Sequence, residues 1–395
     1  MSTHVGIGFS QNPNPSVAAQ EAATRAKIQT QQPTIDLAII LNTIHYHPSQ
    51  TLEALQEILE EAKIIGCTTA GIILSEAIEM RGVAVVAVKS DELHFGISHI
   101  PEILSQDLRQ AGNLLARKAM NDFGMIPRQG FLFFMDGLLK NSDPLIKGLQ
   151  EVFGTLFCMA GAGSCDDFHF KKTYQYCQDM FLTNGACGLL IGGSLNFVAA
   201  SRHGFRPLGR PRIVDRSQGN IIKTIDGKKA YSLYEEFLGE EASALRSKTF
   251  SPMATLYPLG IFLDEEKEYL LRNAVDILSD GSIVCPGEIP EGKQIHIMIG
   301  SKDSLRAAAH DCALEIQASF KGNPPKLVII FESLLRYKLL GRGAYQEIQM
   351  IKEILGEHTP IVGMHSFGEV SPFHAREPFK KTHVQHETIV IIALG

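Results

Sequence analysis

The chain has 395 residues, of which 45% are hydrophobic and 20% are charged, and its formal net charge is −6. This composition is typical of a folded globular protein, and the length predicts about two domains. The acidic balance excludes a general nucleic-acid binder, because contact with phosphates needs a basic surface. No apolar run is long enough to span a bilayer and no signal peptide is evident, so we expect a cytoplasmic protein without direct membrane insertion.

A strand–helix–strand unit that ends in a glycine-rich bend occurs three times along the chain. The apolar runs are 37–41, 131–135 and 327–331, the helical stretches are 52–62, 145–153 and 345–355, and the bends are 64–71, 158–164 and 361–369. Repetition predicts related bends that come together in space. Because glycine has no Cβ, a ligand can approach such backbone closely. The repeat therefore predicts a binding site.

The other predicted elements follow the same repeat. Alanine-rich or amphipathic helices precede the three copies at 16–28, 106–120 and 302–320. After the bends come predicted β-pairs at 83–88 with 94–100 and at 185–191 with 195–201, and a last strand at 388–394. Repeated helix–strand–helix–strand units with mixed sheets predict an α+β fold. Helices on one face of each sheet would leave the other face to pack on a second sheet, in α/β/β/α layers.

Residues 202–216 form the predicted joint between two halves, because Pro207, Gly209 and Pro211 interrupt regular structure there. The following residues 214–227 predict a strand, a turn, a second strand and an Asp-Gly turn. A short helix is expected at 231–238. The predicted domains are therefore 1–215 and 216–395.

Several motifs in the chain match one family in their order and spacing. They are Gly6-Ile7-Gly8-Phe9-Ser10, Ile65-Gly66-Cys67-Thr68-Thr69-Ala70-Gly71, Lys172-Thr173-Tyr174, His203-Gly204-Phe205-Arg206-Pro207-Leu208-Gly209, Val362-Gly363 with Phe367-Gly368-Glu369, and His386-Glu387-Thr388. On these residues the chain resembles the FIST domain, whose paired N-terminal and C-terminal modules occur in signalling proteins. It departs from the family pattern at Ser333, where a cysteine is more typical, and at Glu387, where asparagine is usual.

The resemblance implies an intracellular sensor of small molecules such as amino acids. Some family members bind haem and respond to nitric oxide, which makes haem the one cofactor to consider. No effector domain follows the final predicted strand, so we expect signals to pass through a separate protein such as a kinase or a chemoreceptor.

The predicted ligand-binding residues lie in or near the bends, where backbone N–H groups and hydroxyls are accessible. They are Gly66, Cys67, Thr68, Thr69, Gly163, Ser164, Asp166, Thr173, Arg206, Arg336, Gly368 and Glu369. Asp166 or Glu369 could hold a cationic group, and either arginine could hold a carboxylate with two hydrogen bonds. The alternative interpretation is that the glycines only permit tight connections and that the charged residues cap or solvate loops.

Two further functions stay open at this point. In a haem sensor, His203 is the favoured axial ligand, with His45 and His386 as alternatives. In a thiol-dependent enzyme, Cys67 or Cys165 would be the nucleophile, but neither has an adjacent base in the sequence. Known hydrolase, P-loop and zinc-protease motifs are absent from the sequence, so we assign no catalytic residue and no metal ligand.

Overall fold

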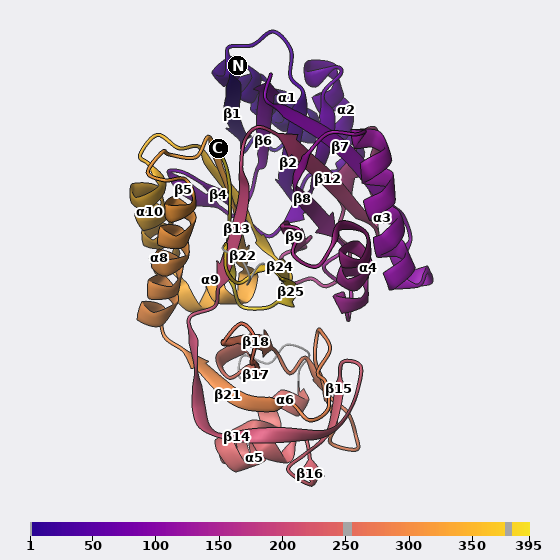
Figure 1. Cartoon of the computed structure of the whole chain (residues 1–395), viewed down its shortest axis with the longest axis vertical. Coiled ribbons are helices and arrows are strands. Elements are labelled where there is room, and N and C mark those ends of the chain that lie inside the picture. The colour runs from indigo at the N-terminus through magenta and orange to yellow at the C-terminus, as the bar shows by residue number, and fades with distance from the viewer. Residues whose placement is uncertain (1, 248–254, 376–380) are drawn as a thin grey trace.

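The computed structural model describes residues 2–247, 255–375 and 381–395. In these residues the chain forms four sheets, and three of them share one pattern of strand order. The three related sheets and their helices form a body, and the fourth sheet lies below it (Figure 1). The predicted α+β class is confirmed.

The first unit packs an alanine-rich helix directly on a glycine-containing strand. Its elements are β1 (Thr3–Ser10), α1 (Pro15–Thr30), β2 (Leu37–Thr43), α2 (Pro48–Leu59), β3 (Lys63–Thr69), β4 (Ile72–Leu74), β5 (Ala77–Glu79) and β6 (Val83–Ser90). The side chain of Asn14 caps α1 by accepting from the N–H of Val17. A Cβ on Gly8 would lie 1.8 Å from the carbonyl oxygen of Ala22, so the close approach requires glycine.

The second unit repeats this order. Its elements are β7 (Leu93–Ile100), the 3₁₀ turn η1 (Ile103–Ser105), α3 (Leu108–Phe123), β8 (Arg128–Met135), α4 (Asp143–Phe153), β9 (Met159–Gly163), β10 (Gln175–Cys177), β11 (Met180–Leu182) and β12 (Ala186–Gly193). Asp107 caps α3 by accepting from the backbone N–H groups of the first turn.

The third unit is interrupted by the fourth sheet. Its elements are β13 (Phe197–Arg202) and, after the interruption, α8 (Lys302–Ser319), β22 (Leu327–Ser333), α9 (Leu334–Leu340), α10 (Gly343–Leu355), β23 (Ile361–Ser366), β24 (Glu369–Pro372), β25 (Thr382–Gln385) and β26 (Ile389–Leu394). Ser301 and Ser304 form a capping box at the start of α8.

Residues 205–300, which we call the insert, leave the body after β13 and return to it at α8. The elements of the insert are β14 (Phe205–Gln218), β15 (Ile221–Ile225), β16 (Lys228–Lys229), α5 (Ser232–Leu238), η2 (Gly239–Ser243), α6 (Ala244–Ser247), β17 (Leu259–Leu263), β18 (Glu268–Arg272), β19 (Asp276–Ile277), β20 (Ile283–Val284) and β21 (Gln294–Gly300). The expectation of an irregular joint was wrong, because β14 runs through it. The prolines and Gly209 are instead accommodated by a shift in register against β21 between Leu208 and Arg212.

The three units exchange hairpins in a cycle. The β4–β5 hairpin of the first unit pairs with β23 of the third, and β24–β25 of the third pairs with β9 of the second. The β10–β11 hairpin of the second unit completes the cycle by pairing with β3 of the first. Each six-stranded sheet is therefore completed by a neighbouring unit, so the body folds as one interdependent structure.

The predicted β-pairs after the first two bends need correction. The strands form, but β6 pairs with β1 and β2, whereas β7 pairs with β12 of the next sheet. Both edges of β6 are already occupied, so the chain must cross to a new sheet. Both edges of β12 are likewise occupied, by β7 and β8. The next strand, β13, therefore joins the third sheet.

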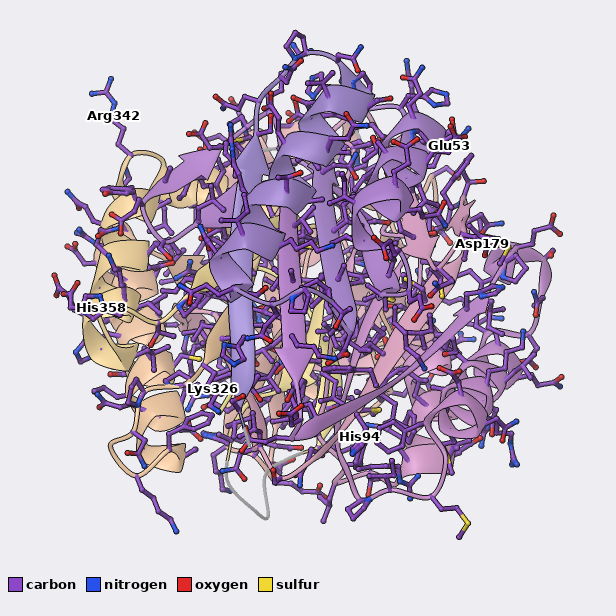
Figure 2. All side chains as sticks on the ribbon, turned by 90° about the horizontal axis from the view of Figure 1, so that it is seen from above. Glu53, His94, Asp179, Lys326, Arg342 and His358 are labelled. Carbon is purple, nitrogen blue, oxygen red and sulfur yellow. The ribbon has the colours of Figure 1, made fainter. Side chains whose placement is uncertain are left out.

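Helix pairs cover the outer faces of the three sheets, and the inner faces share one core. Figure 2 shows the helices at the periphery around the strands, with Glu53 and His358 on the outer rim. The inner core includes Ile39, Phe134 and Ile329, one from each unit. Any two sheets with their outer helices therefore form helix–sheet–sheet–helix layers across this core.

Candidate functional site

The three bends meet at the ends of the inner strands. Backbone hydrogen bonds join them in pairs: Cys165 N–H to Thr68 O at 2.9 Å, Gly163 N–H to Gly368 O at 2.9 Å, and His365 N–H to Gly71 O at 3.0 Å. A Cβ on Gly163 would lie 2.2 Å from the carbonyl oxygen of Phe367. The glycines therefore serve contact between the bends, and their predicted convergence is confirmed.

A cavity of about 620 Å³ lies beside this junction, between the second unit, the third unit and the insert. The second unit contributes Met135, Asp136, Gly137, Leu138, Leu139, Lys140, Ser142, Phe168 and Phe170. The third unit contributes Ser333, Leu335, Ser366, Phe367, Gly368 and His386. The insert contributes Asn220, Ile221, Asn273, Val275, Asp276, Leu278, Val284, Cys285 and Pro286. The size fits a small organic ligand.

Phenylalanine rings form one wall of the cavity. Phe170 and Phe367 stack with ring centroids 4.9 Å apart, and the Phe168 ring lies 6.1 Å from Phe367. Phe168 and Phe170 both have positive φ, which is rare for large side chains. The Asp166 carboxylate accepts three backbone N–H groups from residues 170–172, at 2.6–3.0 Å, and so holds this loop. Strained backbone of this kind often marks functional sites.

His386 lines the cavity from the loop before β26. Its Nε2 lies 2.8 Å from the carbonyl oxygen of Pro286, so this nitrogen donates and Nδ1 is left as an acceptor. Burial and the nearby Arg272 charge lower the pKa of His386 to about 3, so the ring is neutral at physiological pH. The cavity wall thus offers a hydrogen-bond acceptor to a ligand.

A group of buried charged side chains lies behind this wall, in the third unit. Arg336 donates two hydrogen bonds of 2.7 Å to Glu347 and one of 2.7 Å to Glu332. Glu369 accepts from Ser366 at 2.7 Å and from Thr388 at 2.8 Å. All of these charged residues are at most 1% exposed. We call Glu332, Arg336, Glu347, Glu369 and Glu387 the buried charge cluster.

The cluster touches the cavity through two polar side chains. Ser366 lines the cavity and donates to Glu369, and Asn273 lines it and donates to Glu387 Oε1 at 2.6 Å. The other carboxylate oxygen of Glu387 is buried without a hydrogen-bond partner in the described part of the chain. Burial raises the pKa of Glu369 to about 7 and that of Glu387 to about 8.

The predicted ligand-binding residues occupy several environments, and whether they bind a ligand stays a prediction. Gly368 lines the cavity, and Asp166 and Glu369 lie directly behind its lining. The remaining buried ones are Gly66, Cys67, Thr68, Thr69, Gly163, Ser164, Thr173 and Arg336. Among these, Ser164 and Thr173 hydrogen-bond each other at 2.8 Å beside Asp136. Arg206 is exposed on the insert.

Of the predicted ligand-binding residues, Gly368 is in the cavity lining, together with residues that sequence reasoning missed. Gly66 and Cys67 are not among the lining residues, and the Cys67 thiol instead contacts Met364 in the core. Phe168, Phe170 and Asn273 were not predicted. The two phenylalanines flank His169 just after the Asp166-Asp167 pair, a sequence signal that could have been noticed. Nothing local distinguishes Asn273, because its partner Glu387 lies more than a hundred residues away.

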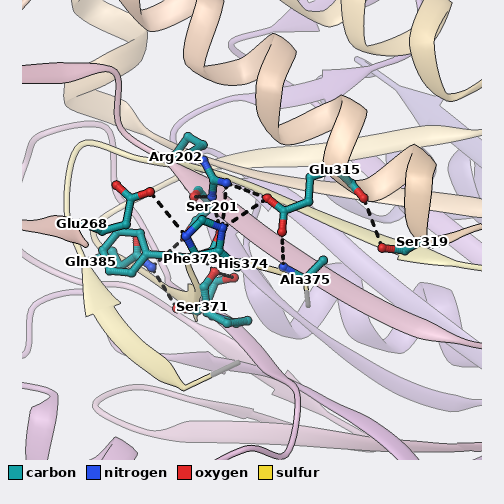
Figure 3. A network of polar contacts seen from close by, with 11 residues as sticks. Ser201, Arg202, Glu268, Glu315, Ser319, Ser371, Phe373, His374, Ala375 and Gln385 are labelled. Atoms are coloured by element: carbon teal, nitrogen blue, oxygen red, sulfur yellow. Dashed lines mark hydrogen bonds and ion pairs between the residues drawn. The ribbon is translucent and has the colours of Figure 1, made fainter. Parts of the chain in front are cut away.

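A second polar network holds the insert against the body (Figure 3). His374 lies between Glu268 of β18 and Glu315 of α8, with nitrogen–oxygen distances of 3.4 Å to each. Arg202, at the end of β13, pairs with Glu315 at 2.5 Å. His383 of β25 contacts Glu266 of the insert at 2.9 Å. These contacts fix the insert over the cavity.

Comparison with known proteins identifies the family. A model of the FIST N domain matches residues 36–228, and a model of the FIST C domain matches residues 230–372. The chain belongs to the FIST family. FIST domains are sensory domains of signal transduction proteins, so the resemblance seen in the sequence is confirmed. The predicted domain boundary at residue 215 stays a prediction.

The relatives that match this FIST protein in sequence include proteins described as uncharacterized. A Mycobacterium tuberculosis protein is 23% identical over 391 residues, covering 93% of this chain and 94% of the relative. A Methanocaldococcus jannaschii protein is 24% identical over 183 residues, which cover 43% of this chain and 34% of the relative. A cyanuric acid hydrolase structure from A. caulinodans covers 99% of both chains, with 9% identity and a TM-score of 0.37, too low to indicate function. In the described residues, no helix has the length and apolarity needed to cross a membrane.

Proposed function

We propose that this FIST protein is a cytoplasmic sensor that binds a small molecule, such as an amino acid, in the cavity. The observation that carries the proposal is the origin of the lining, which comes from residues 135–170 of the first predicted half and 220–386 of the second. A ligand there contacts both halves. It can therefore favour one relative arrangement, provided that its affinity differs between arrangements.

The signal then passes to a separate protein, such as a kinase or a chemoreceptor. The insert is the part best placed to carry the change, because it supplies one side of the cavity and joins the body through the network of Figure 3. A shift of the insert on ligand binding would alter the surface that a partner meets.

Thermal-shift screening with amino acids, amines, carboxylates and other metabolites tests this function. A ligand that binds only the native state raises the melting temperature as its concentration rises. Phe170→Ala removes part of the cavity wall and should abolish the shifts. Phe181→Ala, an exposed ring on β11 outside the cavity, is the matched control and should keep them. If no compound in the library raised the melting temperature of the wild-type protein, the proposal would be contradicted.

The haem alternative has weaker support from the geometry. His203 lies outside the cavity lining, and its Nδ1 accepts from the N–H of Phe205 at 2.8 Å. His386 lines the cavity, but its Nε2 is bonded to Pro286. His203 therefore fits an axial ligand poorly, whereas His386 would have to bind iron through Nδ1. Titration with haem tests this directly, and a Soret band lost in His386→Ala but retained in His203→Ala would revive the alternative.

The thiol-dependent enzyme also has weak support. Burial raises the pKa of both Cys67 and Cys165 well above the usual value for a thiol, so neither carries a reactive thiolate at neutral pH. Labelling by iodoacetamide at neutral pH should be slower in the native protein than in the denatured protein at both positions.

A further inference from the structure

We propose that the cavity selects an organic cation, a ligand whose amine or guanidine nitrogen is positively charged, and holds that nitrogen near Asn273, Ser366 and His386. This inference rests on the proposed sensor function and adds the chemical class of the ligand. Three features of the site support it: the carboxyl groups behind the wall, the polar groups that reach the cavity, and the aromatic wall.

The first feature is an excess of buried carboxyl groups over buried basic groups. Four carboxyl groups of the cluster accompany a single guanidinium, that of Arg336. The guanidinium of Arg272, which lies near His386, is paired with Asp143 at 3.5 Å. Arg336 is already matched by Glu347 through two parallel hydrogen bonds. In the described residues, no lysine or arginine forms an ion pair with Glu369 or Glu387. A cation in the adjacent cavity would favour the ionised form of these carboxyl groups and offset their charge, whereas an anion would be repelled by them once they ionise.

The second feature is an unsatisfied carboxylate oxygen close to the lining. Glu387 is fully buried, its Oε2 lacks a hydrogen-bond partner, and its backbone has a φ of 56°. Its other oxygen is held by Asn273, whose side chain lines the cavity. Such an arrangement is costly for folding alone and therefore indicates a function. The Nδ1 of His386 adds an acceptor that suits an N–H donor of the ligand.

The third feature is the aromatic wall. The faces of aromatic rings attract cations, and pairs of rings are a common way to bind ammonium groups. Phe168 already does so in this structure, because the Lys338 Nζ lies 5.4 Å from its ring centroid. The stacked rings of Phe170 and Phe367 extend the same surface. An organic cation thus finds both a favourable field and an apolar surface for its carbon skeleton.

The test compares matched ligands that differ in charge. Isothermal titration at pH 8 uses sets of an amine, an alcohol and a carboxylate with similar carbon skeletons, beginning with 2-phenylethylamine, 2-phenylethanol and phenylacetate. Further sets use alkyl and guanidino skeletons. We expect at least one amine or guanidine to bind about tenfold more tightly than its alcohol, and its carboxylate to bind more weakly still.

Two substitutions locate the preference in the site. Glu387→Gln keeps the hydrogen bond to Asn273 with little change in shape, and it should reduce the affinity for the cation about tenfold while changing that for the alcohol less than about twofold. Phe170→Leu should also lower the affinity for the cation more than the affinity for the alcohol. Glu236→Gln, an ion-paired residue on the exposed face of the insert, is the matched control and should change neither affinity.

The outcomes separate this inference from the sensor function itself. If a carboxylate or an alcohol binds as well as its amine, or if Glu387→Gln leaves the cation preference intact, the inference is overturned while the sensor function stands. If no compound binds, in these sets or in the wider thermal-shift library, both the cation preference and the sensor function are contradicted.

Discussion

At the scale of single residues, the buried glutamates couple folding to pH. Burial raises the pKa of Glu369 to about 7 and of Glu387 to about 8, above the value that a glutamate has in an unfolded chain. The folded state therefore binds protons more tightly than the unfolded state. Their contribution to stability is fully present below the unfolded pKa and is lost as the pH rises through 7 to 8.

Glu387→Gln should remove part of this loss, because the amide cannot ionise. We expect the free energy of unfolding to fall between pH 5 and pH 9 in the wild-type protein, and the variant to be more stable at pH 9 by on the order of 2 kcal/mol. Urea unfolding at several pH values measures both. If the free energy of unfolding fell equally steeply with pH in the variant and the wild type, Glu387 could not be a buried residue that ionises in this range.

Asp166 shows how one carboxylate can position an aromatic wall. It accepts three backbone N–H groups, and residues 167, 168 and 170 all have positive φ. Asp166→Ala should cost about 1–3 kcal/mol and weaken any ligand of the cavity, because the loop loses its hydrogen bonds. Asp179→Ala, in the exposed turn between β10 and β11, should change neither the stability nor the affinity (Figure 2). Binding that survives Asp166→Ala unchanged would show that the loop is held by other contacts.

At the scale of elements, α3 and α4 cross at two facing glycines. A Cβ on Gly112 would lie 2.1 Å from the carbonyl oxygen of Leu145, and a Cβ on Gly148 would lie 2.1 Å from that of Arg109. The two backbones are thus in direct contact, and the helices cannot separate without disturbing the sheet that they cover.

Gly148→Ala should therefore destabilise the protein by about 1–3 kcal/mol, although alanine is the better helix former. Gly343→Ala is the control, since Gly343 begins α10 with open space around it, and this variant should be neutral or more stable by up to about 1 kcal/mol. Thermal unfolding of both variants checks the difference. An equally stable Gly148→Ala variant would mean that the crossing can open at little cost.

The elements also show where sequence reasoning reached its limit. The strands and helices of the repeat were predictable, because their apolar periodicity is local. The exchange of hairpins was not, because β4 and β5 are three residues each and β23, the partner of β4, lies almost 300 residues away. The buried charge cluster was equally hidden. Glu369 was a predicted site residue and Glu387 a noted departure from the family pattern, but Glu332 and Glu347 resemble ordinary surface glutamates in sequence. Only the fold brings the four together.

At the scale of the whole molecule, the joint between the body and the insert is an ionic network. Arg202 and Glu315 belong to the body, Glu268 belongs to the insert, and His374 lies between the two carboxylates (Figure 3). Hydrogen bonds to Glu268 and Glu315 raise the pKa of His374 to about 9. The charged imidazole thus stabilises the joint below the unfolded pKa of a histidine, and this stabilisation is lost as the pH rises through about 9.

Glu268→Gln should loosen the joint without unfolding the body. At pH 7 we expect hydrogen-exchange protection factors, corrected for intrinsic rates, to fall about tenfold within residues 255–300 while those of the three units stay unchanged. In the wild-type protein, the same residues should lose protection between pH 7 and pH 9.5, and the variant should lose less, because its joint is already weakened. Glu236→Gln, in the insert but away from the joint, is the control. A loss of protection spread evenly over the units would mean that the insert and the body unfold together, and the insert could not then move as a separate part when a ligand binds.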